Sequence, residues 1–403
     1  MSKRKHSNIK GRLQVFFEMS KLSIPAIVGG AGTLISAIGA VVSKAEDKLI
    51  FLGFALLSLI VVIVTLIIKL REYHLDLKGM HYLDDPGYVT KMEQKITEST
   101  DLTIIKSNRF ESTDYMVAVD DAVNEYLFKN AKEIAIVVDG KYRLPKEYRD
   151  ILRFSLDKKL TSGHRFFDAP KYRLYSSINV GTKQIKLEKT RYFYSFATNE
   201  NAFKRIRSYR SLAFKFDGGN ALFDDDGRLL SNEMSYQSNH LGASTLAFTK
   251  DGYVIIGKQN NENNVNGGRN VPSGSGSINL CDFRGNLEDM AAANMNRELR
   301  EECGISKKVK IDTKLIAYGR FVNRGFKPDF FGISFVYATK EELERNRGDG
   351  ELVNKAFVKV DNVEHLLEII HKYDAAASIQ LAAYSHFLEA GYIKDYVSSM
   401  LPR

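Results

Sequence analysis

The sequence predicts a two-helix transmembrane hairpin, an intervening α/β segment and a C-terminal cytoplasmic α+β domain in which a mixed sheet packs between helices. The chain has 403 residues, 44% hydrophobic and 27% charged, and is long enough to bury more than one core. Two long apolar stretches near the N-terminus carry no charge, and the rest alternates strand-like and helix-like patterns. The predicted parts are 1–21, 22–42, 49–68, 72–205 and 206–395.

The hairpin is predicted from Leu22–Val42 and Leu49–Ile68, which contain no charged residue. Each approaches the ~20 residues that a helix needs to cross a bilayer. Residues 1–21 carry six basic side chains and one acidic one, and Lys69 and Arg71 follow the second stretch. By the positive-inside rule, both termini are expected in the cytoplasm. A buried hairpin of a soluble fold is the alternative for this region.

Small residues recur in the first stretch at spacings that place them on one side of a helix. Gly29, Gly32 and Ser36 belong to these rows. Such rows let helix backbones approach closely in a membrane. They predict either self-association into larger assemblies or simple packing of the hairpin as a passive anchor.

Charge and cysteine content limit the classes of function. The net charge of +9 favours anionic partners such as phosphates, nucleotides or anionic lipid. Two cysteines, Cys281 and Cys303, are too few for a disulfide-stapled secreted scaffold and indicate a reducing compartment. The sequence has no metal spacing of a structural zinc site, no Walker-type loop and no serine nucleophile elbow.

The middle segment, 72–205, mixes helix-like and strand-like patterns. Val117–Asn130 has apolar residues at helical spacing, and Ile134–Val138 predicts a strand that ends at the turn Asp139-Gly140. Aromatic and basic residues interleave through Lys171–Phe196. That pattern suits stacking against nucleobases and also suits half-exposed strands, so both interpretations stay open.

The C-terminal part predicts a sheet covered by helices. Leu241–Phe248 and Tyr253–Gly257, joined through Asp251-Gly252, are typical of a hairpin, and Asn260–Gly276 of a long mobile loop. Further strands and helices complete the domain: strands Leu315–Arg320 and Phe330–Tyr337, and amphipathic helices Val363–Lys372 and Ala375–Ala390.

The strongest chemical signal is the run from Arg297 to Ile305. Glu298, Glu301 and Glu302 lie three and four residues apart, so a helix brings the three carboxylates to one face. A cation offsets their mutual repulsion, and hard oxygen ligands suit Mg²⁺ or Mn²⁺. Leu299 is expected to face the core, and Arg297 to pair with a neighbouring acid. Gly304 predicts the helix end and Ile305 the apolar contact after it; a solvated acidic helix with a glycine cap is the alternative.

This run resembles the second half of the Nudix box, and the resemblance to a Nudix fold extends over about 207–392. It implies that Glu298, Glu301 and Glu302 bind Mg²⁺ or Mn²⁺, and that Glu301, Asp289 and Arg297 are catalytic. The first half of the box departs from the family. Asp289 stands where the family has Glu, and Phe283 where it has Gly, which puts efficient hydrolysis in doubt.

A hairpin, a middle segment and a Nudix-like domain together resemble the SMODS-associated NUDIX effectors, the CD-NTase-associated proteins of bacterial CBASS antiviral defence. The resemblance implies activation by a cyclic oligonucleotide, a link to a cyclic-nucleotide synthase and assembly into a homo-oligomer. It implies a multi-pass location in the cell inner membrane and damage to the lipid bilayer that kills the host. Nucleotide-binding residues are not identified, and no DNA ligand is expected. The alternative is a membrane-tethered Nudix hydrolase that cleaves nucleoside diphosphate-linked substrates with Mg²⁺.

Overall fold

A computed structural model describes residues 77–106, 116–161, 167–210, 215–261, 268–373 and 378–401, together with Gln14 and most positions between Leu52 and Val64. The chain divides into two compact units, which are described separately. The first comprises Met1–Leu83 with Ile206–Phe216, and the second comprises Asp84–Arg205 with Asp217–Arg403.

The first unit contains a small sheet. Strand β1 (Met80–Tyr82) pairs antiparallel with β7 (Arg205–Ser208), and β8 (Lys215–Asp217) is the third strand. The ring of His81 stacks on the ring of Tyr209 with their centroids 4.0 Å apart.

The prediction of a transmembrane hairpin is overturned. In the part of the chain that the structure describes, no helix is both long enough and apolar enough to cross a membrane. Leu22–Val42, with Gly29, Gly32 and Ser36, lies outside the described residues. The described residues of Leu49–Ile68 lie between Leu52 and Val64 and are helical.

The predicted multi-pass location in the inner membrane depended on this hairpin and is corrected with it. The same holds for the predicted orientation, with both termini in the cytoplasm, because it was read from the charges that flank the two stretches.

The second unit is built on a mixed sheet of nine strands. Its main path runs β11-β10-β9-β14-β13-β3-β2, with β12 paired to β9 and β15 paired to β10. Strands β9 and β14 are parallel, and the other pairs are antiparallel. The strands are β2 (Thr103–Lys106), β3 (Met116–Val119), β9 (Gly242–Thr249), β10 (Tyr253–Gln259), β11 (Asn270–Val271), β12 (Gly274–Ser277), β13 (Ile311–Phe321), β14 (Lys327–Val336) and β15 (Leu352–Lys359).

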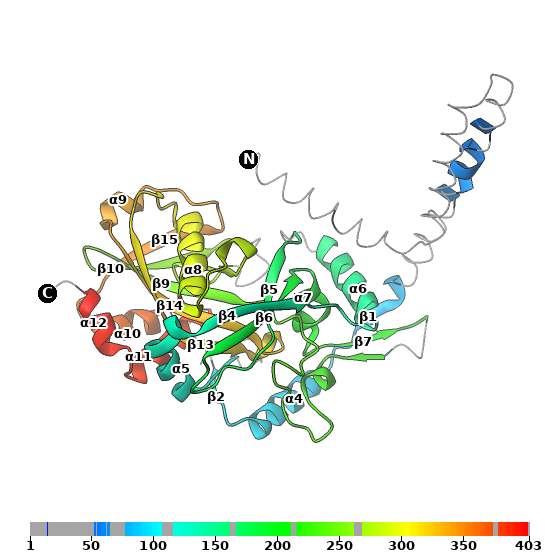
Figure 1. Cartoon of the computed structure of the whole chain (residues 1–403), viewed down its shortest axis with the longest axis horizontal. Coiled ribbons are helices and arrows are strands. Elements are labelled where there is room, and N and C mark those ends of the chain that lie inside the picture. The colour runs from blue at the N-terminus through cyan, green and yellow to red at the C-terminus, as the bar shows by residue number, and fades with distance from the viewer. Residues whose placement is uncertain are drawn as a thin grey trace. The chain divides into compact units, whose positions relative to one another are not determined.

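Helices cover both faces of this sheet (Figure 1). Helix α8 (Leu287–Cys303) packs on one face, and α10 (Val363–Lys372), α11 (Ile379–Glu389) and α12 (Lys394–Met400) pack on the other. Along β9 the side chains alternate as the pleat requires. Ala243 and Ala247 lie in the clusters on the α8 side, and Leu246 and Phe248 lie in the cluster with the C-terminal helices. The described residues therefore form the α+β arrangement predicted for the C-terminal part, a mixed sheet between helices.

A second, three-stranded sheet lies in the middle segment, with the order β4-β6-β5. Its strands are β4 (Ala135–Lys141), β5 (Pro170–Leu174) and β6 (Gln184–Arg191). The remaining helices are α4 (Pro86–Ser99), α5 (Asp121–Asn130), α6 (Tyr148–Thr161), α7 (Tyr194–Ala197) and α9 (Lys340–Glu344). The short 3-10 helices are η2 (Ala131–Glu133), η3 (Asn199–Asn201), η4 (Gly219–Leu222), η5 (Leu280–Asp282) and η6 (Val322–Arg324).

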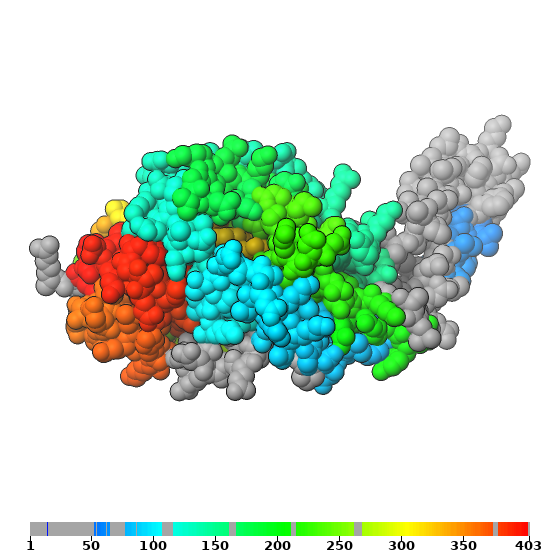
Figure 2. Space-filling model, turned by 90° about the horizontal axis from the view of Figure 1, so that it is seen from below, coloured from blue at the N-terminus to red at the C-terminus, as the bar shows by residue number. Residues whose placement is uncertain are grey.

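Part of the middle segment belongs to the large sheet. Ala118 of β3 pairs with Arg320 of β13, and β2 pairs with β3 on its other side. Phe128 of α5 packs against Tyr392 and Tyr396. Figure 2 shows the cyan surface of this segment beside the red surface of the C-terminal helices.

Most predicted elements of the C-terminal part are confirmed, including the hairpin of β9 and β10 and the limits of α10. Three element predictions are wrong. The strand predicted to end at Asp139-Gly140 continues, because β4 extends to Lys141. Val117–Asn130 is not one helix, because the Asp120 side chain accepts a hydrogen bond from the Val123 amide (3.0 Å) and begins α5 after strand β3. Asn260–Gly276 is not a loop throughout, because β11 and β12 pair with β10 and β9.

Candidate functional site

Helix α8 carries the candidate site on its C-terminal half, and its two ends are fixed by the sequence. Asn286 caps the start by accepting a hydrogen bond from the Asp289 amide (2.9 Å). Gly304 ends the helix in the left-handed conformation, with φ of 70°. Leu299 and Ile305 are buried in one cluster with Ala247. These contacts confirm the predicted core face, helix end and apolar contact, and they set the direction of the neighbouring carboxylates.

The three glutamates that the sequence singled out occupy different environments. Glu301 is half exposed, the Glu298 side chain is 13% exposed, and Glu302 is buried. Arg297 Nη1 lies 2.8 Å from Glu298 Oε1 and 3.2 Å from Glu301 Oε2, so one guanidinium joins two of the carboxylates.

Glu302 points inward from the same helix. Its Oε1 accepts a hydrogen bond from the Ser275 amide of β12 (3.3 Å). Its Oε2 is buried and has no hydrogen-bond partner among the residues that the structure describes. A buried carboxylate oxygen without a partner is costly, which makes this atom the clearest sign of a missing ligand at the site.

Burial and like charge shift both inner glutamates in the same direction. Burial raises the pKa of Glu298, and together with the opposing effect of Arg297 and the smaller raising effects of the Glu351 and Glu301 carboxylates the result is a pKa of about 8. Burial also raises the pKa of Glu302 well above its ordinary value, with Glu298 and Glu351 adding to the effect. Both groups therefore resist ionisation unless a positive charge joins them.

The donor set fits a hard divalent cation. All the donors are carboxylate oxygens, which Mg²⁺ and Mn²⁺ prefer. The described residues contain no His, Cys, Asp or Glu cluster already gathered as a metal site. Gly276 of β12 lies against the Glu298 side chain, because a Cβ at position 276 would overlap the Glu298 carboxylate. Glycine at 276 thus lets Glu298 approach the strand.

The structure identifies a site residue that the sequence analysis missed. Asp282, at the end of η5, receives two hydrogen bonds from Arg297: Nε to Oδ1 (3.0 Å) and Nη2 to Oδ2 (2.9 Å). Burial alone would raise the pKa of Asp282, but hydrogen bonds from Arg297, Asn279 and Asn294 hold it below its ordinary value. Its only sequence signal is the Asn-x-x-Asp spacing that forms a capping box with Asn279.

Asp289 lies elsewhere on α8. Its side chain accepts a hydrogen bond from Asn286 Nδ2 (2.8 Å) in the first turn. It precedes Glu298 by nine residues, which is roughly 13 Å along a helix. Phe283, where a glycine was expected, has φ of −56° and ψ of 132°, so this turn does not need glycine. The structure thus brings together Arg297, Glu298 and Glu301 and leaves Asp289 apart.

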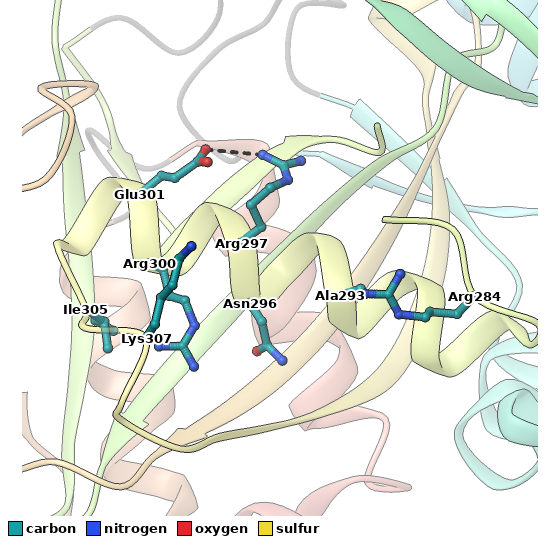
Figure 3. A pocket seen from close by; sticks show the side chains of 8 residues that line it. All are labelled: Arg284, Ala293, Asn296, Arg297, Arg300, Glu301, Ile305 and Lys307. Carbon is teal, nitrogen blue, oxygen red and sulfur yellow. Dashed lines mark hydrogen bonds and ion pairs between the residues drawn. The ribbon is translucent and has the colours of Figure 1, made fainter. Parts of the chain in front are cut away.

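A groove of about 600 Å³ runs along the exposed side of α8 (Figure 3). Arg297 and Glu301 line one part of it, and Arg300 lies on the other side of the helix in this view, next to Lys307 of the segment that follows α8. Arg300 Nη2 donates to the carbonyl of Val309 (2.7 Å), so this side chain also fixes the turn after α8. Solvent therefore reaches Glu301 from the groove.

The aromatic and basic residues of Lys171–Phe196 lie mainly on β5 and β6. Arg173 pairs with Glu188 (2.6 Å) and lies over the rings of Tyr142 and Tyr175. Arg191 pairs with Asp168. These cations already have internal partners, which favours the strand interpretation for them over stacking against nucleobases.

Comparisons with known proteins give a limited result. No family model matches the chain, and no curated protein matches it. Similar solved structures include DR0079 from Deinococcus radiodurans, with 15% identity over 36% of this chain and 81% of that one. The MutT protein of Methanosarcina mazei Go1 shares 14% identity over 38% and 91% of the two chains.

A third similar structure is Tm1382, described as a putative Nudix hydrolase, with 11% identity over 43% of this chain and 78% of that one. The TM-score is 0.27 in each of the three cases. Likenesses at this level do not indicate what this chain does. The residues of α8 and their neighbours are the features that bear on its function.

Proposed function

We propose that this chain is a Nudix-type hydrolase that uses Mg²⁺ or Mn²⁺ to cleave nucleoside diphosphate-linked substrates. The observation that carries the proposal is the unpartnered Oε2 of buried Glu302 beside the raised pKa of Glu298. Two buried carboxylates that resist ionisation on one helix are expected where a cation is to be bound. Their spacing, together with Arg297 and Gly304, also resembles the Nudix box.

Each residue has a role that follows from its position. A bound divalent cation would neutralise negative charge on the phosphoryl oxygens. Glu298 and Glu302 would hold the cation through their buried oxygens. Glu301 is reached by solvent, so it accepts a proton from the water that attacks phosphorus. Arg297, fixed by Asp282, positions the carboxylates of Glu298 and Glu301.

The experiment incubates the full chain with Mg²⁺ or Mn²⁺ and a panel of compounds such as ADP-ribose and dinucleoside polyphosphates. Mass spectrometry then identifies the products. We expect nucleoside monophosphate products, and a loss of at least about 100-fold in rate for Glu302→Gln, since removing a ligand costs several kcal/mol of transition-state stabilisation. Glu341→Gln, on the exposed side of α9, is the matched control and should keep the wild-type rate. The proposal fails if no phosphoanhydride bond in the panel is cleaved, or if Glu302→Gln is as active as the wild type.

A second proposal is that the chain is a CBASS receptor for a cyclic oligonucleotide that assembles into a homo-oligomer. The net charge of +9 favours such an anionic ligand, and the departure of Asp289 and Phe283 from the Nudix box suits a domain that binds without cleaving. The same assay separates the two proposals. A receptor retains cyclic dinucleotides or trinucleotides intact, whereas a hydrolase converts the linear diphosphate compounds.

A further inference from the structure

A second buried group of side chains lies beside α8, and its charge is opposite to that of the glutamates. We call Lys171, His240, Arg324 and Lys327 the cationic cluster. Lys171 lies on β5, His240 on the segment that leads into β9, Arg324 at the end of η6 and Lys327 at the start of β14. Strand β5 runs beside the segment of His240, because Leu241 donates a backbone hydrogen bond to the carbonyl of Tyr172 (2.9 Å).

Two of the three cations are neutralised by neighbours. Lys327 pairs with Asp329 (2.9 Å) and Arg324 pairs with Glu200 (2.5 Å). Lys171 is different. Its Nζ donates to Asn279 Oδ1 (2.5 Å) and to the carbonyl of Ser277 (3.3 Å), and none of the described contacts joins it to a carboxylate. Among the described residues Lys171 therefore forms no direct ion pair, although the Glu298 and Asp282 carboxylates lie near enough to raise its pKa against the larger effect of burial.

His240 is the second unsatisfied member of the cluster. The residue is fully buried, and neither Nδ1 nor Nε2 has a hydrogen-bond partner among the described residues. Burial lowers the pKa of His240 well below its ordinary value, and Lys327, Arg324 and Lys171 lower it further. The ring is therefore neutral and carries one N–H donor that lacks an acceptor, surrounded by cations.

The cluster adjoins the glutamates of α8. The carbonyl of Ser277 accepts hydrogen bonds both from Lys171 Nζ and from Arg297 Nη2 (3.4 Å). Burial lowers the pKa of Lys171 to about 8, and the nearby Glu298 carboxylate acts in the opposite direction. An anion that accepts a hydrogen bond from Lys171 would therefore lie close to a cation held by Glu298.

We infer that Lys171 and His240 form a subsite for a phosphate group, next to the ion-paired Arg324 and Lys327 and beside the glutamates of α8. A substrate that fits both sites has two neighbouring phosphates, one at the cation site and one at Lys171. The inference rests on the proposed function only for the nature of that substrate. Binding of a free diphosphate to the subsite does not require hydrolysis.

The experiment titrates the full chain with inorganic pyrophosphate by isothermal calorimetry at pH 7, in EDTA so that no divalent cation takes part. We expect the wild type to bind, and Lys171→Met to bind at least tenfold more weakly. Lys132→Met, an exposed lysine of η2, is the matched control and should bind as the wild type does. His240→Leu provides a second variant of the subsite, with an expected loss of at least threefold in affinity.

The melting temperature without ligand separates binding from a structural role. Removing an unpaired buried charge should leave the Tm of Lys171→Met unchanged or raise it, whereas a structural role predicts a lower Tm. The inference is overturned if the wild type does not bind pyrophosphate, as expected if only a buried water satisfies His240. It is also overturned if both subsite variants bind like the wild type. Hydrolysis without pyrophosphate binding refutes the subsite alone, and binding without hydrolysis refutes the proposed activity alone.

Discussion

The second unit contains two groups of buried charges that the fold treats in opposite ways. In the ion pairs Lys327–Asp329 and Arg324–Glu200, each charge has a partner within 2.9 Å. On α8, Glu298 and Glu302 are buried beside further carboxylates, and Glu302 Oε2 has no described partner. The ion pairs can be understood from the folded chain alone. Glu302 Oε2 lacks a partner among the described residues, which is why these glutamates mark the candidate site.

The ion pairs should give the largest loss of stability when one partner is removed. Asp329→Asn leaves the buried Lys327 without its counterion, and we expect the free energy of unfolding to fall by about 3–5 kcal/mol. Urea denaturation measures this change. The double variant Lys327→Met/Asp329→Leu is the control and should recover most of the loss, because neither charge is then buried. If Asp329→Asn were as stable as the wild type, the buried ion pairs would not differ from the glutamates of α8 in the way described.

The glutamates should make stability depend on pH in the opposite direction from an ordinary carboxylate. The pKa of Glu298 rises from 4.5 to about 8 on folding, so the folded chain holds a proton that the unfolded chain releases in this window. The free energy of unfolding without metal should therefore fall as the pH rises from about 4.5 to 8, by on the order of 5 kcal/mol. Denaturation at a series of pH values measures it. The difference from Glu298→Gln isolates this residue, and equal pH profiles for the two proteins would count against a Glu298 carboxyl whose pKa is raised by burial.

A smaller effect compares the two aspartates that could serve Arg297. Asp282→Asn loses a charge-assisted pair of hydrogen bonds and should cost about 2 kcal/mol of stability. Asp289→Asn changes only an exposed side chain in the first turn of α8, and should cost no more than about 0.5 kcal/mol. Thermal unfolding of the two variants side by side measures the difference. If Asp289→Asn were the more damaging, the assignment of Asp282 as the partner of Arg297 would be wrong.

These aspartates also show how far the sequence could predict the site. Glu298, Glu301, Leu299 and Gly304 follow from local helical spacing, so their environment on α8 could be derived without the fold. Asp282 reaches Arg297 from an irregular turn fifteen residues earlier in the chain, and no periodic pattern places it there. The resemblance to the Nudix box instead pointed to Asp289, which lies at the other end of the helix.

The fold shows the same limit of local patterns. The hairpin of β9 and β10 and the helix α10 were predicted because apolar period and turn residues determine them locally. The pairing of β3 with β13 joins segments about two hundred residues apart, and the sequence gives no sign of that register. The transmembrane hairpin predicted from charge-free composition is wrong, since no helix among the described residues is long and apolar enough to cross a membrane.

The cationic cluster could not be predicted from the sequence either. Lys171 was noticed only as one of several basic residues among aromatic ones, and His240 carried no motif. Their shared burial depends on β5 lying beside the segment that enters β9. Residues that lack partners in the folded chain, rather than residues in motifs, therefore indicate this part of the site.

The most direct test of the cation site is the melting temperature of the full chain at pH 8, with Mg²⁺ and with EDTA, for the wild type and Glu302→Gln. We predict that Mg²⁺ raises the Tm of the wild type, by an amount equivalent to about 2.7 kcal/mol at 100 times the Kd. Glu302→Gln should melt higher than the wild type in EDTA, because it no longer buries an ionisable oxygen without a partner, and should not respond to Mg²⁺. A wild type that melts at the same temperature in Mg²⁺, Mn²⁺ and EDTA, or a Glu302→Gln variant that responds as the wild type does, would contradict the assignment of these glutamates as a metal site.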